Sequence, residues 1–392
     1  MPSRTIAPLR LPLARRGAID PFIVMDVMRQ ANEREAAGEG VIHMEVGQPG
    51  TPAPRPVIEA ARRALDESLI GYTDALGLPR LRERISRWYR DCYGVSVAPE
   101  RVVVTTGSSA GFLLAFLAIL DVGARVALPS PGYPCYRHIL KAVGAESEII
   151  ETGPASRWSI TPELLASAHG RRRLDALLLA SPANPTGTML LGDSLGGLAG
   201  ACDELGMWFI SDEIYHGLDY VEPARTVLSW SDAPIVINSF SKYFSMTGWR
   251  IGWMIVPDGL VRTIERLAQN LYISPPTLSQ FAAMAAFDAI EELEAIKAVY
   301  ARNREVMLEE LARAGLTEVV PADGAFYIYA DVTKFTNDSA AFAGKMLRET
   351  GVAATPGIDF DAARGNGYIR FCYSGRPADV EEAARRLKTW LA

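Results

Sequence analysis

The chain has 392 residues, of which 49% are hydrophobic, so it can bury a large core and is long enough for two domains. Lysine and arginine number 40 against 46 aspartate and glutamate residues, and the net charge of -6 offers no positive field for nucleic acid or anionic lipid. The most apolar run, residues 110–120, is too short to span a bilayer. We therefore expect a protein with neither a nucleic-acid nor a membrane partner.

The cysteines and histidines are not spaced like metal ligands or a disulfide framework. The sequence has no CxxC pair, and both residue types are scattered along the chain, at Cys92, Cys135, Cys202, Cys372, His43, His138, His169 and His216. The sequence therefore predicts no metal site. Unpaired thiols fit a reducing compartment, and we expect the protein to be cytoplasmic.

The N-terminal residues 1–16 contain four arginines and no acidic residue, a composition that faintly resembles a transit peptide. Pro2, Pro8 and Pro12 would interrupt an amphipathic helix in this segment. We expect an extended N-terminal arm instead.

Apolar runs and helical patterns alternate through the middle of the chain. Strands are predicted at residues 101–106, 125–129, 174–180, 207–211, 234–240 and 251–256. Helices are predicted at residues 108–120, 136–143 and 191–205. This alternation predicts an α/β fold with a mostly parallel sheet covered by helices on both faces. Ligands of such sheets bind beyond the carboxyl ends of the strands.

The pattern changes near residue 275. A long, charge-laced helical stretch is predicted at 278–314, followed by short strands around 326–329 and 368–371 and helices at 339–349 and 378–391. We expect a large domain at residues 46–280 and a smaller α+β domain at residues 281–392.

The most informative segment runs from Ser239 to Arg250, between two predicted buried strands. A lysine amine can form a Schiff base with an aldehyde, hydroxyl groups can donate to a phosphate, and an arginine adds a permanent cation. A lone lysine in such a polar segment is usually a solvated loop residue, but the flanking strands place Lys242 inside a core. The layout predicts a covalent site for pyridoxal 5'-phosphate, formed by Lys242, Ser239, Ser241 and Arg250.

Three further polar clusters follow predicted strands. Ser108 and Ser109 open a helix, where they could hold a phosphate or only cap the helix. Asn184 lies between two turn-forming residues, a pattern that is also typical of a plain turn. Asp212 ends an apolar strand, where a carboxylate needs a charged partner such as a protonated pyridine nitrogen, unless it caps a helix.

Together these segments resemble the class I/II aminotransferases of pyridoxal phosphate fold type I, the aspartate aminotransferase-like enzymes. The motifs Ser-Pro-x-Asn-Pro-Thr-Gly at 181–187, Asp-Glu-x-Tyr at 212–215 and Ser-x-Ser-Lys-x-x-x-x-x-Gly-x-Arg at 239–250 occur in the family order. The resemblance covers nearly the whole chain. It implies that residues 1–45 form an N-terminal arm that contributes to the small domain, and that the protein is a homodimer with shared active sites.

The resemblance also implies roles for the motif residues at the cofactor. Lys242 would carry the cofactor as a Schiff base and then act as the base that moves the substrate proton. Asp212 would pair with the pyridinium nitrogen, and Asn184 and Tyr215 would hydrogen-bond to the 3' oxygen. The phosphate would be held by Ser108, Ser109, Ser239, Ser241 and Arg250.

Two tyrosines complete the implied cofactor site. Tyr72 would reach the phosphate from a second subunit, because residues 71–82 resemble the family segment that does so. Tyr133 would stack on the pyridine ring, although either tyrosine could instead be a core residue.

Arg370 is the candidate for binding the substrate carboxylate, because a planar guanidinium can form a bidentate pair with it. Placed between Ile369 and Phe371 in a strand, it could also be an edge residue that extends to solvent. Gly47 resembles the family glycine whose backbone meets the same carboxylate, with Asn184 close to the substrate. The apolar segment 19–25 could close over the site.

We compared three functions on these grounds. The first is an aminotransferase that transfers the amino group of an L-amino acid to a 2-oxo acid by a ping-pong cycle through Lys242. The alternative is a carbon-sulfur β-lyase, since the same fold can direct one intermediate to several products. A non-catalytic binding module does not fit, because every catalytic position is present. The sequence does not identify the substrate pair.

Overall fold

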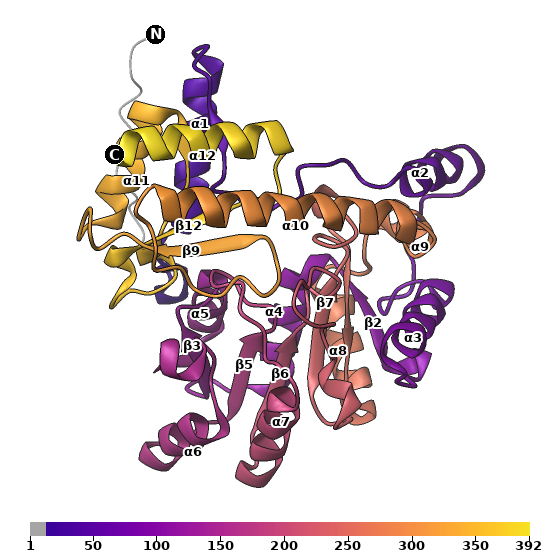
Figure 1. Cartoon of the computed structure of the whole chain (residues 1–392). Coiled ribbons are helices and arrows are strands. Elements are labelled where there is room, and N and C mark those ends of the chain that lie inside the picture. Colours follow the sequence, from indigo (N-terminus) through magenta and orange to yellow (C-terminus); the bar gives the residue numbers. More distant parts are fainter. Residues whose placement is uncertain (1–12) are drawn as a thin grey trace.

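The computed structural model describes residues 13–392 (Figure 1). The expectations on Arg4, Arg10, Pro2, Pro8 and Pro12 lie outside the described residues. The described part of the arm begins with a short 3-10 turn, Arg15–Gly17, and leads into helix α1, Ile23–Ala36. None of the described helices is long and apolar enough to cross a membrane.

A seven-stranded sheet forms the centre of the large part of the molecule. Its strand order is β2-β8-β7-β6-β5-β3-β4, and every strand is parallel to the others except β8, which runs antiparallel to both neighbours. The strands are β2 (Val102–Thr105), β3 (Arg125–Ser130), β4 (Glu146–Glu151), β5 (Ala176–Ala180), β6 (Trp208–Asp212), β7 (Ile235–Ser239) and β8 (Gly252–Ile255). The predicted mostly parallel sheet is confirmed.

Both faces of this sheet are buried, because successive side chains of each strand enter opposite cores. In β2, Val103 packs with α4, α5 and α8 on one face, whereas Val102 and Val104 pack with α3, α6 and α7 on the other. The helices are α3 (Pro79–Tyr93), α4 (Gly107–Ile119), α5 (Pro134–Val143), α6 (Pro162–Arg171), α7 (Ser194–Leu205) and α8 (Asp258–Leu271). Figure 1 shows these helices around the strands.

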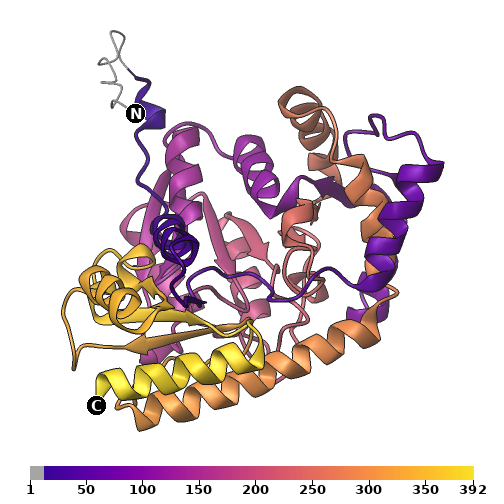
Figure 2. The same cartoon turned by 90° about the horizontal axis from the view of Figure 1, so that it is seen from above.

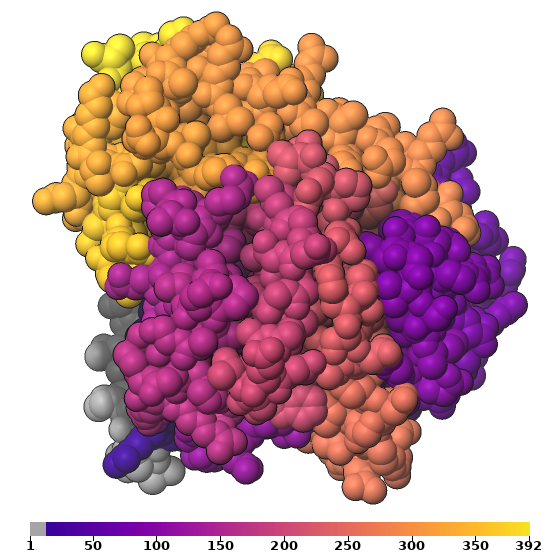
Figure 3. Space-filling view, turned by 60° about the horizontal axis from the view of Figure 1, so that its bottom comes forward, coloured from indigo at the N-terminus to yellow at the C-terminus, as the bar shows by residue number. Residues whose placement is uncertain are grey.

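The C-terminal part forms a second layer beside the large sheet (Figure 3). Its three-stranded antiparallel sheet has the order β11-β12-β9, and α11 packs against β11 and β12. These elements are α10 (Ile290–Arg313), β9 (Tyr327–Asp331), α11 (Ser339–Thr350), β11 (Thr355–Pro356), β12 (Tyr368–Cys372) and α12 (Pro377–Leu391). Figure 2 shows α10 and α12 lying side by side.

The N-terminal segment joins this second layer through strand pairing. Strand β1 (Ile42–His43) is parallel to β10 (Val352–Ala353), and α1 packs against β10 and β11. The boundaries at 45/46 and 280/281 stay a prediction.

The helical stretch predicted at 278–314 is divided in the structure. It consists of α9 (Thr277–Ala286) and α10, with a break at residues 287–289. Helix α9 packs on α2 (Arg55–Glu67) in the large part, whereas α10 packs on α12. The break turns the chain because Phe287 is buried among the rings of Trp88, Phe240 and Phe244.

Candidate active site

A cavity of about 210 Å³ lies where the parallel strands end, facing the C-terminal part of the chain. Most of the predicted site residues line it, and they come from distant parts of the sequence. They are Gly47, Ser108, Ser109, Tyr133, Asn184, Asp212, Tyr215, Ser241, Lys242, Arg250 and Arg370. Tyr72 and Ser239 are not among its lining residues.

Lys242 follows β7 on a turn, and its amine is held inside the cavity. Its Nζ donates a hydrogen bond to the carbonyl of Gly47 over 2.5 Å. Burial is the main cause that lowers the pKa of Lys242 from 10.5 to about 8. A lysine with a lowered pKa more readily provides the neutral amine that nucleophilic and base chemistry require. The interpretation of Lys242 as a solvated loop residue is therefore wrong.

Asp212 is the last residue of β6, and its side chain is only 3% exposed. The Tyr136 hydroxyl and the Ile214 backbone amide, at 3.0 Å, donate to its carboxylate. Burial is the main cause that raises its pKa to about 6. No helix begins at this position, so the helix-cap alternative is wrong. The carboxylate faces the cavity without a cation bonded to it in the described chain.

The N-terminus of α4 and Arg250 form one end of the cavity. Ser108 and Ser109 lie in the first turn of α4, where free backbone N–H groups and the helix dipole favour an anion. Gly107 has a φ of 70°, and a Cβ at this position would collide with the Arg250 guanidinium. Arg250 itself has a φ of 51°, an uncommon conformation for a residue with a side chain.

Ser239 supports this end of the cavity from behind its wall. Its hydroxyl bonds to the Ser241 hydroxyl at 2.9 Å and to the Ile251 carbonyl at 3.1 Å. Its side chain is buried and is not among the residues that line the cavity. Its bond to Ser241 orients a residue that does line the cavity, and the direct phosphate contact of Ser239 stays a prediction.

Arg370 is the middle of β12, the central strand of the small sheet, and is 1% exposed. Its Nη1 donates to Asn184 Oδ1 at 2.9 Å, and its Nη2 donates to the Thr355 hydroxyl at 3.1 Å and to the Glu45 carbonyl. Bonding through Oδ1 leaves the Asn184 NH₂ group free to donate elsewhere. The edge-residue alternative for Arg370 is wrong, because the guanidinium is buried.

The Arg370 guanidinium lies between two aromatic rings. Its Cζ is 4.5 Å from the ring centre of Tyr327 and 4.7 Å from that of Phe360. Its Nε is buried without a hydrogen-bond partner, and no ion pair within residues 13–392 includes it. A buried arginine without a counter-charge is expensive unless a ligand supplies an anion.

Tyr327 was not singled out in the sequence as a site residue. Its hydroxyl is 2.7 Å from the Tyr215 hydroxyl, and both residues line the cavity. A Cβ at Gly47 would overlap the Tyr327 hydroxyl, so glycine is required there for steric reasons. No signal in the sequence points to Tyr327, because its contacts with Gly47 and Tyr215 arise only in the folded chain.

The apolar wall of the cavity comes from the start of α1 and from Tyr133. Phe22, Val24 and Met25 line the cavity, and the rings of Phe22 and Tyr133 meet edge to face at 5.8 Å. The carboxylate of Asp359 accepts hydrogen bonds from the first backbone amides of α1, which anchors this helix. The segment expected to close over the site at 19–25 therefore contributes residues 22, 24 and 25.

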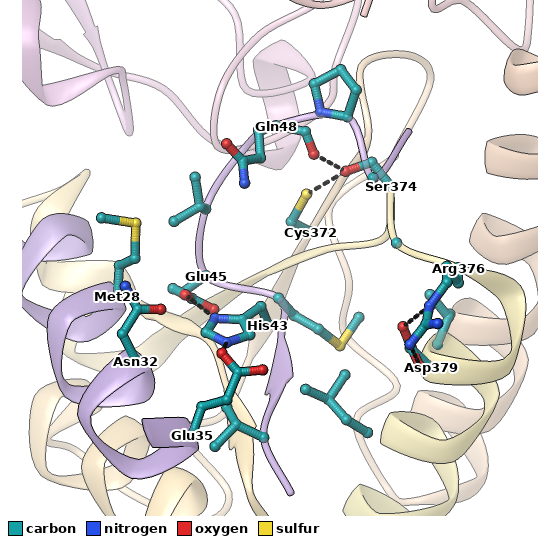
Figure 4. A pocket seen from close by; sticks show the side chains of 18 residues that line it. Met28, Asn32, Glu35, His43, Glu45, Gln48, Cys372, Ser374, Arg376 and Asp379 are labelled. Atoms are coloured by element: carbon teal, nitrogen blue, oxygen red, sulfur yellow. Dashed lines mark hydrogen bonds and ion pairs between the residues drawn. The ribbon is translucent and has the colours of Figure 1, made fainter. Parts of the chain in front are cut away.

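A larger cavity of about 500 Å³ lies on the other side of segment 45–50 (Figure 4). His43 lies there between two carboxylates, with Nδ1 2.8 Å from Glu45 Oε1 and Nε2 3.6 Å from Glu35 Oε2. The hydrogen bond to Glu45 is the main cause that raises the pKa of His43. None of the predicted site residues lines this cavity. The two cavities share Val46 and Gln48 in their linings, and the Glu45 carbonyl of the larger one accepts a hydrogen bond from Arg370.

The charges around the smaller cavity fit pyridoxal phosphate. Lys242, Arg250 and Arg370 line it, against Asp212 as the one acidic lining residue. None of the three cations forms an ion pair within the part of the chain that the structure describes. A doubly charged phosphate and a substrate carboxylate would balance them, and a pyridinium nitrogen would balance Asp212.

The histidines and cysteines do not form a further site. Among residues 13–392, no group of three or more His, Cys, Asp or Glu side chains is arranged to hold a metal ion. All four cysteines are free thiols, and Cys92 is exposed.

Comparison with known proteins gives consistent matches over nearly the whole chain. The family described as aminotransferase class I and II matches residues 39–387. A valine–pyruvate aminotransferase of Mycobacterium tuberculosis is 48% identical over 97% of this chain and 98% of its own. An aspartate/prephenate aminotransferase of Thermus thermophilus is 32% identical over 95% of this chain and 97% of its own. The crystal structure of an aminotransferase from Mycobacterium tuberculosis matches with a TM-score of 0.95 at 47% identity, covering 97% of this chain and 99% of the other.

Proposed function

The chain belongs to the class I and II aminotransferases, a family of pyridoxal phosphate-dependent enzymes, and on that premise we propose that it transfers the amino group of an L-amino acid to a 2-oxo acid in this cavity. We propose further that Lys242 holds the cofactor covalently through Nζ and that the two half-reactions share one site. The observation that carries the proposal is the convergence of three unpaired cations and one buried carboxylate on one cavity.

Each part of the cofactor would be held by residues already in position. Ser108, Ser109, Ser241 and Arg250 would bind the phosphate, and Asp212 the ring nitrogen. Asn184 and Tyr215 would donate to the 3' oxygen, with the Tyr133 ring against the pyridine face. When bound, pyridoxal phosphate supplies an aldehyde carbon that accepts the amino group and a ring that withdraws electrons from the substrate α-carbon.

Lys242 would carry the proton that the reaction requires. Once Nζ is free as a neutral amine, it can take the proton from the substrate α-carbon. It would then donate this proton to the cofactor carbon that accepts the amino group. A pKa of about 8 keeps a useful fraction of neutral amine near neutral pH. Arg370 fixes the substrate carboxylate, which orients the α-carbon toward this amine.

We infer that the donor has an apolar side chain. We assign the three cations that line the cavity to the Schiff base, the cofactor phosphate and the α-carboxylate, so among residues 13–392 no lining cation is left for a second carboxylate. Apart from Asp212, none of the other described lining residues is charged, and the apolar ones include Phe22, Val24, Met25 and Tyr133. The relative from Mycobacterium tuberculosis is named for valine and pyruvate, which supports the same substrate class here.

The substrate prediction is tested by steady-state rates with pyruvate as the common acceptor. We expect kcat/KM for valine and other apolar donors to exceed that for aspartate and glutamate by about 100-fold, because an unpaired carboxylate would be desolvated on the apolar wall. Alanine formation from pyruvate is the measured quantity for every donor except alanine. Equal or faster turnover of aspartate would overturn the apolar assignment.

The carbon-sulfur β-lyase alternative has no observation in its favour. The relatives described above are named as aminotransferases, and the apolar wall presents no group placed to assist a leaving thiol. We therefore propose the aminotransferase alone. The free thiols are in keeping with a cytoplasmic enzyme.

We propose that the enzyme is a homodimer with shared sites. Tyr72 is 82% exposed and does not line the cavity of its own chain. It lies in an apolar surface formed by two segments that are hydrogen-bonded to each other, with Leu69, Ile70, Leu271 and Ile273 also exposed. A second copy would bury this surface and bring its own Tyr72 to the phosphate.

Hybrid dimers test this shared site. We expect Lys242→Ala and Tyr72→Ala homodimers both to be impaired at limiting cofactor. Subunits mixed randomly should then recover about a quarter of wild-type activity, because half the dimers are hybrids and each hybrid has one intact site. Activity that stays at the level of the unmixed variants would show that each site takes both residues from one subunit and would contradict the sharing.

A further inference from the structure

Tyr327 connects two residues that the proposed function assigns to different ligands. Its hydroxyl is 2.7 Å from the hydroxyl of Tyr215, which faces the cofactor position. Its ring packs against the guanidinium of Arg370, with 4.5 Å between the ring centre and Cζ. Tyr327 itself is 1% exposed and lines the cavity, so its position is fixed.

The surroundings of Tyr327 suggest the direction of its hydrogen bond. Only one of the two hydroxyls can donate in the bond between Tyr215 and Tyr327. Tyr215 is the only hydrogen-bond partner of the Tyr327 hydroxyl within residues 13–392. If Tyr215 donates to an anionic oxygen in the cavity, Tyr327 must be the donor to Tyr215. Both O–H dipoles then point toward the negative charge, and the two bonds strengthen each other.

The neighbouring backbone leaves room for this arrangement. Gly47 approaches the Tyr327 hydroxyl so closely that any side chain at position 47 would displace it. The Gly47 carbonyl also accepts the hydrogen bond from Lys242 Nζ. The hydroxyl of Tyr327 therefore lies within the group of residues that surround the reacting amine.

We propose that Tyr327 is a positioning residue with two separable functions, an inference that rests on the proposed function. Its hydroxyl donates to Tyr215 and thereby strengthens the hydrogen bond from Tyr215 to the 3' oxygen of the cofactor. Its ring holds the Arg370 guanidinium flat against the substrate carboxylate, opposite Phe360. Through these contacts the residue links the cofactor side of the site to the substrate side.

The hydroxyl function is tested by the pH dependence of the visible spectrum of the cofactor-loaded enzyme without substrate. Donors to the 3' oxygen stabilise its anionic form and lower the pH midpoint of the absorbance change. We expect Tyr215→Phe to raise this midpoint by about 1 pH unit and Tyr327→Phe by about 0.5 unit. The double variant should shift no further than Tyr215→Phe alone, because Tyr327 acts through Tyr215.

Tyr329→Phe is the matched control for this experiment. Tyr329 lies two residues along the same strand, and its buried hydroxyl has no hydrogen-bond partner in the described chain. It does not line the cavity. Loss of this hydroxyl should leave the midpoint unchanged, which separates a specific effect of Tyr327 from a general loosening of β9.

The ring function is tested by KM. Tyr327→Phe keeps the ring and should leave KM for the amino donor unchanged, whereas Tyr327→Leu should raise it about fivefold. A midpoint shift with Tyr215→Phe but none with Tyr327→Phe would overturn the role of Tyr327 alone. No shift with either variant would overturn both this role and the proposed contact between Tyr215 and the cofactor. Equal KM values for the Phe and Leu variants would overturn the ring function.

Discussion

Replacing Lys242 by alanine is expected to abolish transamination, lowering turnover by about 10⁴-fold or more while the chain still folds. Within residues 13–392, Lys242 is the only lysine that lines the cavity, so no other described lysine amine lies at the reacting atoms. Folding should be preserved because burial disfavours the charged form of this side chain, as its lowered pKa shows. Turnover is measured with saturating cofactor, and folding by circular dichroism and thermal unfolding.

Lys242→Arg is the matched variant for this prediction. It keeps a positive charge at the same position, but a guanidinium does not give up its proton under the conditions of the reaction. We expect it to be as inactive as Lys242→Ala. Retained transamination in either variant would contradict the assignment of the reacting amine to Lys242.

Replacing Arg370 by alanine is expected to lower kcat/KM for amino acid donors by about 10²- to 10³-fold. The guanidinium is buried, held by Asn184, Glu45 and Thr355, and lacks a counter-charge until a carboxylate binds. Loss of one partner from a buried charge pair costs about 2–5 kcal/mol. Arg370→Lys should recover only part of the loss, because an ammonium cannot form the bidentate pair.

A donor without a carboxylate provides the control for Arg370. Isobutylamine has the side chain and amine of valine but no carboxylate. The wild-type enzyme should prefer valine strongly, and Arg370→Ala should lose most of this preference because valine turnover falls while isobutylamine turnover does not. An undiminished preference in Arg370→Ala would show that another group binds the carboxylate.

Short motifs explain why much of the site could be predicted from the sequence. Asp212 ends strand β6, and Asn184 and Lys242 follow β5 and β7, so the pattern of strands already places them at one edge. The local sequence indicates their function, because each is a charged or amide residue near the end of an apolar run. The structure brings all three to one cavity.

The residues that sequence reasoning missed are joined to the site only by the tertiary fold. Tyr327 is 112 positions from Tyr215, and its role depends on the packing of the small sheet against the large one. The sequence predicts that segment 19–25 closes over the site, but it does not show the contact that places Phe22 and Val24 at the wall, which is the capping of α1 by Asp359, more than 300 positions away. No local sequence pattern reveals a contact between residues so far apart in the chain.

One further difference has an equally physical cause. The stretch 278–314 has helical periodicity throughout, but the burial of Phe287 among aromatic rings favours a break over a continuous helix. Tertiary contacts therefore decide between options that the sequence leaves equal. The phosphate contact of Ser239 stays a prediction, because its hydroxyl is bonded to Ser241 and Ile251 in the structure.

We propose that both half-reactions of a transamination with apolar amino acids take place in one cavity. The most direct measurement is the visible spectrum of the purified, cofactor-loaded enzyme as single L-amino acids are added without any 2-oxo acid. We predict a stoichiometric and stable loss of the visible band with valine, reversed by pyruvate, and little change with aspartate. A band that returns unaided, with continuous release of a 2-oxo acid and ammonia, would contradict the account.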